Sequence, residues 1–108
     1  MNTGALLNIT LDGGAKLAHG PTEGYYTLNS MDNEKQNWIQ VQGSGAIWYN
    51  ETHKNWMIAR KENLWSSGCD LGSTHNTIRP EDATTWKYLT KDRKWMFTSN
   101  IFGPSSMY

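Results

Sequence analysis

The sequence predicts an all-β fold in which antiparallel hairpins form a small sandwich or an open barrel. Three observations favour this class: helical periodicity is nearly absent, aromatic and β-branched runs are short, and clusters of Gly, Asn, Asp and Ser separate them. The chain has 108 residues, about one domain's worth of sequence. We therefore expect a single β domain over residues 1–108.

Seven short strands at this spacing are typical of a sandwich or a small barrel. We expect them at residues 6–11, 25–29, 38–42, 46–50, 55–60, 86–90 and 95–100. Pro80 followed by two acids suits the first turn of a helix, so we expect at most one short helical turn, near residues 80–84. The core module covers about residues 20–100, and we expect its N- and C-terminal extensions to be ordered by self-packing or by a partner chain.

The segment 46–59 predicts a hairpin that is apolar on both faces. If residues 51–54 form the loop, one face carries Tyr49 with Trp56 and Ile47 with Ile58, and the other carries Trp48 with Met57 and Ala46 with Ala59. Such a hairpin is either covered on both sides or displays one adhesive face. The second face singles out Trp48 and Met57.

The segment 86–98 predicts a hairpin that is apolar on one face only. With Asp92 and Arg93 as the turn, the first face carries Trp86, Tyr88, Trp95 and Phe97, and the second carries Lys87, Lys91, Lys94 and Thr98 with Leu89 and Met96. We expect the aromatic face to be core and the basic face to be solvated. A register slip of one residue would reverse this assignment.

The order of these motifs resembles a small all-β module, rich in Trp and Tyr hairpins, that is repeated in proteins of marine and unicellular eukaryotes. The matching motifs lie within about residues 20–100: Gly24-Tyr25-Tyr26, Ile47-Trp48-Tyr49, Asn55-Trp56-Met57-Ile58, Asp70-Leu71-Gly72, Pro80, Trp86-Lys87-Tyr88 and Trp95. The resemblance implies a compact β-module used as a building block, without an imported active site. Members of that module often hold several cysteines, whereas this chain has one, which argues against a secreted setting.

Charge balance excludes two classes of partner. Lys plus Arg and Asp plus Glu each number 10, so the formal net charge is zero. Proteins dedicated to nucleic acid normally carry a basic excess that displaces counterions from phosphates, and polybasic membrane-surface modules carry one as well. We therefore expect no nucleic-acid partner.

The apolar residues indicate a soluble chain that is not itself transmembrane. Hydrophobic residues make up 37% of the sequence, and no apolar run approaches the roughly 20 residues of a membrane-spanning helix. The first residues lack the cationic start and the long apolar run of a secretory signal. Either the protein stays in the compartment where it is made or a targeting segment has been removed, so the sequence does not identify the compartment. Two glycosylation sequons, at Asn8 and Asn50, are about as many as chance supplies.

Residue types that can carry catalysis or bind a metal are present, but their spacing matches no recognisable catalytic or metal-binding motif. Cys69, Asp70 and His75 lie close in sequence, but one thiolate and one nearby histidine fall short of a zinc site. Cys69 and His75 as nucleophile and base lack an orienting partner. Cys69 is also the only cysteine, so an internal disulfide is excluded. We expect no enzymatic activity, no cofactor and no metal ligand.

The surplus of tryptophan, six in 108 residues, is the remaining signal. Trp and Tyr beyond those that fill a core are typical anchors of protein interfaces. The leading hypothesis is therefore a non-catalytic interaction module, an accessory or structural subunit of a larger protein assembly. The alternative is a carbohydrate-binding module that stacks a glycan on exposed aromatic rings. The candidate binding residues are Trp48, Met57 and Trp65; if Trp48 is core, both hypotheses lose that anchor.

Overall fold

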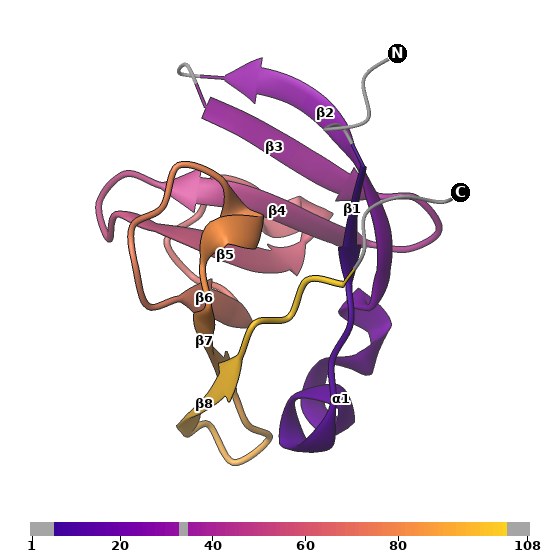
Figure 1. Cartoon of the computed structure of the whole chain (residues 1–108), viewed down its shortest axis with the longest axis vertical. Helices are drawn as coiled ribbons and strands as arrows, with labels where there is room; N and C mark the ends of the chain where they lie inside the picture. The colour runs from indigo at the N-terminus through magenta and orange to yellow at the C-terminus, as the bar shows by residue number, and fades with distance from the viewer. Residues whose placement is uncertain (1–5, 33–34, 104–108) are drawn as a thin grey trace.

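Eight antiparallel strands curl into a half-barrel in the computed structural model, which describes residues 6–32 and 35–103 (Figure 1). Each strand pairs with its neighbour in sequence, so the order in the sheet is the order along the chain. The strands are β1 (Leu6–Ile9), β2 (Gly24–Asp32), β3 (Lys35–Gln40), β4 (Gly45–Asn50), β5 (Asn55–Arg60), β6 (Leu71–Ser73), β7 (Thr85–Leu89) and β8 (Trp95–Ser99). The all-β prediction is confirmed, in its open-barrel form.

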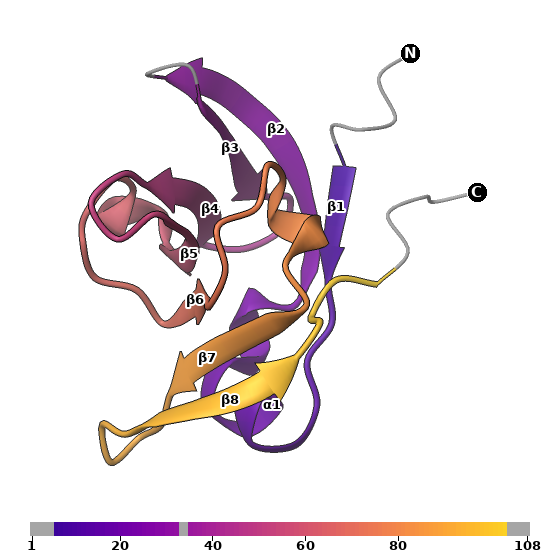
Figure 2. The ribbon, with the colours of Figure 1, turned by 60° about the vertical axis from the view of Figure 1, so that its left-hand side comes forward.

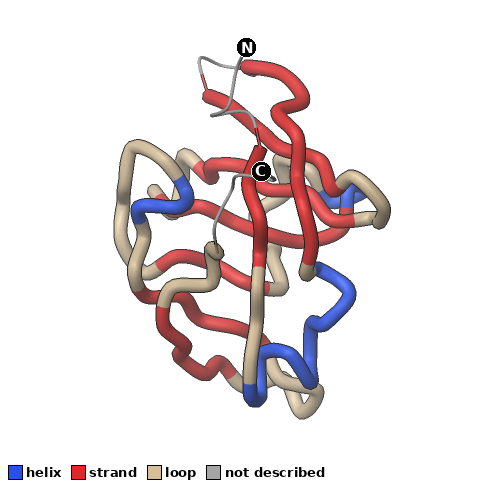
Figure 3. Tube along the Cα trace, turned by 45° about the vertical axis from the view of Figure 1, so that its right-hand side comes forward, coloured by secondary structure: helices blue, strands red, loops and turns tan. Residues whose placement is uncertain are grey.

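Helical structure is more extensive than the sequence predicted. A 3₁₀ turn, η4 (Pro80–Asp82), lies where a helical turn was expected, but the limit to one such turn is wrong. Helix α1 (Gly13–His19) continues into the 3₁₀ turn η2 (Gly20–Thr22), and a further turn, η3 (Lys61–Asn63), follows β5. Figure 3 shows the helical segment that joins β1 to β2 at one end of the half-barrel. The predicted extensions at 1–5 and 104–108 lie outside the described residues.

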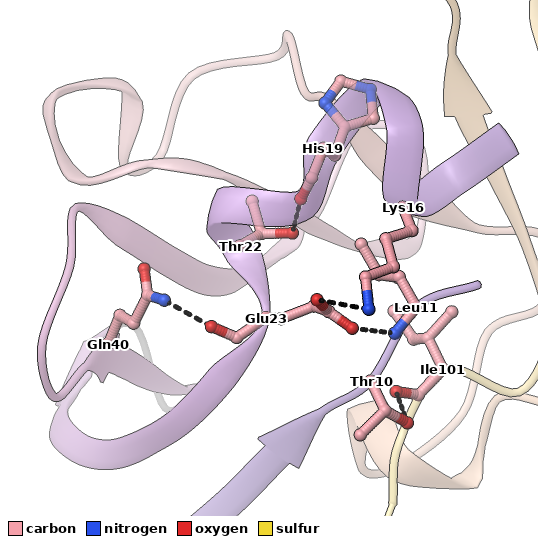
Figure 4. A network of polar contacts seen from close by, with 8 residues as sticks. All are labelled: Thr10, Leu11, Lys16, His19, Thr22, Glu23, Gln40 and Ile101. Atoms are coloured by element: carbon pink, nitrogen blue, oxygen red, sulfur yellow. Dashed lines mark hydrogen bonds and ion pairs between the residues drawn. The ribbon is translucent and has the colours of Figure 1, made fainter. Parts of the chain in front are cut away.

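A polar network fixes α1 and the ends of the sheet (Figure 4). The Glu23 carboxylate accepts a hydrogen bond from Leu11 N at 2.8 Å and lies 3.8 Å from Lys16 Nζ. Gln40 Nε2 donates to Glu23 O at 2.8 Å. Because Glu23, the residue after η2, connects the β1–α1 loop, α1 and β3, the helical segment is held against the barrel end.

The chain after β8 returns to β1 and ties the two ends of the sheet together. Thr10 N donates to Ile101 O at 2.7 Å, and Gly103 N donates to Asn8 O at 2.9 Å. This pairing uses residues 101–103 rather than β8 itself. Within the described part of the chain, β8 pairs only with β7, so its other edge has no partner strand.

Aromatic rings fill the concave, inner side of the sheet. Trp38 and Trp56 meet edge to face with ring centroids 5.9 Å apart, and Tyr49 meets Trp56 at 5.3 Å. Trp86 and Tyr26 are fully buried in the same cluster, and burial raises the pKa of Tyr26. Rings of this size supply much of the apolar burial available to a small domain.

The hairpin of β4 and β5 has the predicted register. Tyr49 lies opposite Trp56 and Trp48 lies opposite Met57, and a turn closed by Lys54 N donating to Asn50 O at 2.8 Å sets that register. The first face belongs to the inner core. Of the two alternatives for the second face, coverage is confirmed.

A segment that we call the strap, residues 61–70, covers the outer face of this hairpin. Beneath it lies a second apolar cluster, made of Ala46, Trp48, Met57 and Ala59 with Ile39, Leu64 and Cys69 packed against them. Trp48 Nε1 also donates to Ser66 O of the strap at 3.3 Å. Trp48 is therefore core, sealed between the sheet and the strap.

The predicted register of the β7–β8 hairpin is wrong by one residue. Leu89 pairs with Trp95 and Lys87 with Phe97, because the turn has three residues rather than two. Thr90 N donates to Lys94 O at 2.7 Å, and Arg93 takes a left-handed conformation with φ of 65°. The slip moves Trp95 and Phe97 from the predicted core face to the outer face.

The packing of the strap predicts a large loss of stability for one tryptophan variant and a small loss for another. Trp48→Ala should lower the free energy of unfolding by about 3–5 kcal/mol, because it leaves a cavity under the strap and frees a hydrogen-bond acceptor. Trp65→Ala, in the exposed part of the strap, should lower it by less than about 1 kcal/mol. Urea denaturation of both variants measures the difference, and equal losses would show that the strap does not pack on Trp48.

Candidate functional site

The strap covers the outer face of β4 and β5 and does not extend over β7 and β8. Beyond the strap lies an open groove of about 800 Å³, which we call the outer groove. Its walls are the 53–55 turn and strap residues 67–69 on one side and the β7–β8 hairpin on the other. The strands contribute Asn55, Met57, Ser73, Lys87, Leu89, Trp95 and Phe97 to its lining.

The most exposed apolar surface beside the outer groove is strand β8. Trp95, Met96 and Phe97 are consecutive and are 43%, 49% and 70% exposed. Figure 2 shows the β7–β8 hairpin extending away from the rest of the sheet, with β8 as its outermost strand. Single exposed apolar residues are common on protein surfaces; three in a row on an edge strand are not.

The charges that line the outer groove are all positive. Lys54, Lys87 and Arg93 face it, and no aspartate or glutamate is among its described lining residues. Lys87 Nζ lies 5.0 Å from the centroid of the Trp95 ring, within the range of a cation–π contact. The ion pairs found in the described residues lie elsewhere, at Lys16–Glu23 and Arg79–Glu81.

The residues around Gly72, among them Asn55, Cys69 and Ser73, form a close-packed floor for the outer groove. A Cβ at Gly72 would lie 3.1 Å from Asn55 Nδ2 and 3.3 Å from Cys69 Sγ. Asn55 Nδ2 donates to Ser73 O at 3.1 Å, and Ser73 Oγ accepts from Trp56 N at 2.9 Å. The floor is therefore held by the sheet, whereas the walls carry the exposed rings and charges.

The structure separates the three predicted binding residues. Trp48 is fully buried, so the expectation that it anchors an exposed ligand is wrong. Met57 is buried beside it and reaches only the floor of the outer groove. Trp65 is 38% exposed at a left-handed position of the strap, φ 71°, and does not line the outer groove.

Trp95 and Phe97, which do line the outer groove, were assigned to the core by the sequence. The signal that could have found them is the alternative register, in which a three-residue turn exposes both rings. No glycine marks the left-handed residue of that turn, because Arg93 occupies it.

The cysteine and histidine singled out in the sequence do not form a nucleophilic pair. Burial raises the pKa of the Cys69 thiol to about 11, with Lys87 lowering it and Asp70 raising it further. A thiol nucleophile needs the opposite shift. The His75 ring nitrogen Nδ1 contacts the Thr74 hydroxyl at 3.0 Å. Across residues 6–32 and 35–103, no three His, Cys, Asp or Glu side chains gather as a metal site would require.

Asn50, the asparagine of the second sequon, has a structural role. It is buried, and its side-chain oxygen caps the β4–β5 turn by accepting a hydrogen bond from His53 N at 2.7 Å. A smaller hollow of about 540 Å³, which includes His19, Arg60 and Asp70, lies between α1 and the β3–β4 turn. None of the described helices has the length and apolar character needed to cross a membrane.

Comparisons with protein-family models, curated proteins and solved structures give no match. The resemblance to the repeated Trp- and Tyr-rich β-module therefore stays a prediction.

The environment of Cys69 predicts a slow, pH-dependent thiol. Its alkylation rate should stay low at pH 8 and rise only toward pH 11, because the raised pKa keeps the thiol protonated. Lys87→Gln should raise the pKa further, since the ammonium that favours the thiolate is lost. The rate of reaction with iodoacetamide between pH 7 and 11 measures both. A pKa below 9 in the wild-type chain would contradict the burial of Cys69, and a pKa lowered by Lys87→Gln would contradict the effect of the Lys87 charge on the thiol.

Proposed function

We propose that this chain is a non-catalytic interaction module that binds a partner protein along strand β8 and serves as an accessory subunit of a larger assembly. The observation that carries the proposal is the open edge of β8, where three large apolar side chains are exposed in succession. Soluble proteins normally protect such an edge with charges, proline, a bulge or a covering segment.

The backbone of β8 supports pairing with another strand. Every other residue of an edge strand points its N–H and C=O groups away from the sheet, where an added strand can bond to them. The neighbouring elements leave this edge accessible, since the returning residues 101–103 pair with β1 instead. A partner strand added there would extend the sheet to nine strands.

The side chains of β8 support an interface rather than a solvated surface. Trp95 and Phe97 stand on the outer face and Met96 on the opposite face, so an added strand would bury apolar surface on both sides. Trp, Phe and Met are enriched at protein interfaces. Charged residues, which protect many edges, are confined to the turn that precedes β8.

A carbohydrate-binding module is the second candidate. Two rings at alternate positions of one strand, Trp95 and Phe97, form a platform of the kind on which sugar rings stack, and the outer groove supplies hydroxyl and amide groups. The Lys87 ammonium covers part of the Trp95 ring, however, and Trp65 stands apart from this platform. The protein-binding reading uses all three exposed side chains of β8, whereas the glycan-binding reading leaves Met96 without a role.

A photo-cross-linking residue placed on β8 tests the proposal. With benzoylphenylalanine at position 97, the protein expressed in its source cells should cross-link to one partner chain. The same residue at position 78 is a matched control, because Ile78 is 92% exposed and belongs neither to β8 nor to the lining of the outer groove. We expect the product from position 97 only, within a particle much larger than the 12.3 kDa chain.

Two results would overturn the proposal. One is a free species of about 12 kDa after gentle extraction, with no cross-link from position 97. The other is a cross-link from position 78 that equals the one from position 97. Retention of the free chain on a glycan array, abolished by Trp95→Ala, would establish the second candidate instead.

A further inference from the structure

We infer that the partner segment is an acidic, extended peptide whose backbone pairs with β8 and whose carboxylates reach the cations that the β7–β8 hairpin presents at the outer groove, Lys87 and Arg93. The inference rests on the proposed function and adds the chemistry of the partner. The observation behind it is the one-sided charge of the outer groove in a chain whose net charge is zero.

Three cations face the outer groove without a carboxylate to neutralise them. Lys54 lies at its turn end, Lys87 on the β7 wall and Arg93 at the tip of the β7–β8 hairpin. Among the described residues, none of the three takes part in an ion pair. Asp70, whose charge acts on Cys69, lines the other hollow, on the side of α1. Asp92 lies beside Arg93 in the hairpin turn, where its carboxylate accepts a hydrogen bond from the Thr90 hydroxyl. The outer groove is thus a positive site bounded by two exposed aromatic rings.

The arrangement of the cations fits an extended peptide. Side chains of an added strand alternate between the two faces of the sheet. Those on the outer face would lie beside Trp95 and Phe97, with Lys87 behind the Trp95 ring. Acidic side chains on the outer face would reach Arg93 at the hairpin tip and Lys87 across the Trp95 ring, whereas Lys54, three strands from β8, lies beyond their reach. Apolar side chains between them would meet Met96. An alternating acidic and apolar segment satisfies both faces.

Two other occupants suit the surface less well. A second copy would bring its own hairpin, with Lys87, Lys91, Arg93 and Lys94 against a single Asp92, edge to edge with the first. A single-stranded nucleic acid would use the rings and the cations, but it would leave the N–H and C=O groups of β8 unpaired. Only the acidic peptide uses the charges, the rings and the backbone edge together.

Synthetic peptides test the inference directly. The probes are a capped peptide of about ten residues that alternates Glu and Val, the same peptide with Lys for Glu, and the Glu peptide with N-methylated backbone positions. Binding to the full chain is followed by amide chemical shifts. We expect shifts in β8 and at Lys87 with the Glu peptide, about tenfold weaker binding of the Lys peptide, and loss with the N-methylated one. Raising the salt from about 0.05 to about 0.3 M should weaken binding.

A matched pair of variants separates the outer groove from general charge. Lys87→Gln with Arg93→Asn removes two cations of the groove, and Asn suits the left-handed position of Arg93. Arg60→Gln with Lys61→Gln removes two exposed cations outside it. The first pair should weaken the Glu peptide about five- to tenfold and the second less than about twofold, with unchanged thermal unfolding in both.

Each remaining outcome overturns the inference. Equal binding of the Glu and Lys peptides removes the charge argument, and full binding of the N-methylated peptide removes the strand pairing. Tighter binding of an oligothymidylate than of the Glu peptide assigns the groove to nucleic acid. No binding of any peptide also overturns it. A partner that cross-links at position 97 through a segment without acids would sink this inference and leave the proposed function standing.

Discussion

The hairpin of β4 and β5 is apolar on both of its faces, and the rest of the structure is arranged around the need to cover both. The inner face packs into the aromatic core of the half-barrel. The outer face requires a second layer, which the strap supplies with Leu64, Cys69 and the hydrogen bond from Trp48 to Ser66. Without the strap the outer face would expose Trp48 to water, so the fold requires this second layer.

The strap is short, and the part of the outer face that it does not reach stays exposed. It covers the outer face of β4 and β5 and rejoins the sheet at β6. The outer face of β6 to β8 has no corresponding layer in the described chain, and the returning residues 101–103 tie β1 rather than β8. The exposed rings of Trp95 and Phe97 are therefore a consequence of where the cover ends. We propose that a partner protein covers this exposed surface.

Sequence reasoning succeeded where the periodicity was local and symmetric. In the β4–β5 hairpin both candidate faces were apolar, so the register followed from the turn alone. It failed at the β7–β8 hairpin, because Arg93 adopts a left-handed conformation that the sequence would mark with glycine or asparagine. Helix α1 was not predicted because it begins with two glycines and ends before Gly20-Pro21, which is a turn signature. Strand β6 was not predicted because it has three residues with Gly72 at its centre. That Trp48 is core could not be decided without the strap, whose packing is a tertiary property.

Amide hydrogen exchange in β8 tests most directly whether its edge is open in the free chain and covered in the assembly. The amides of an open edge strand alternate between protected groups that donate to the neighbouring strand and unprotected groups that point away. In the isolated chain we expect alternate amides of β8 to exchange as fast as those of an unstructured peptide. In the assembly that we propose they should become protected, while the exposed segment around Ile78 is unchanged. Equal exchange of β8 in the two states, whether fast or slow, would contradict the proposal that a partner completes this edge of the sheet.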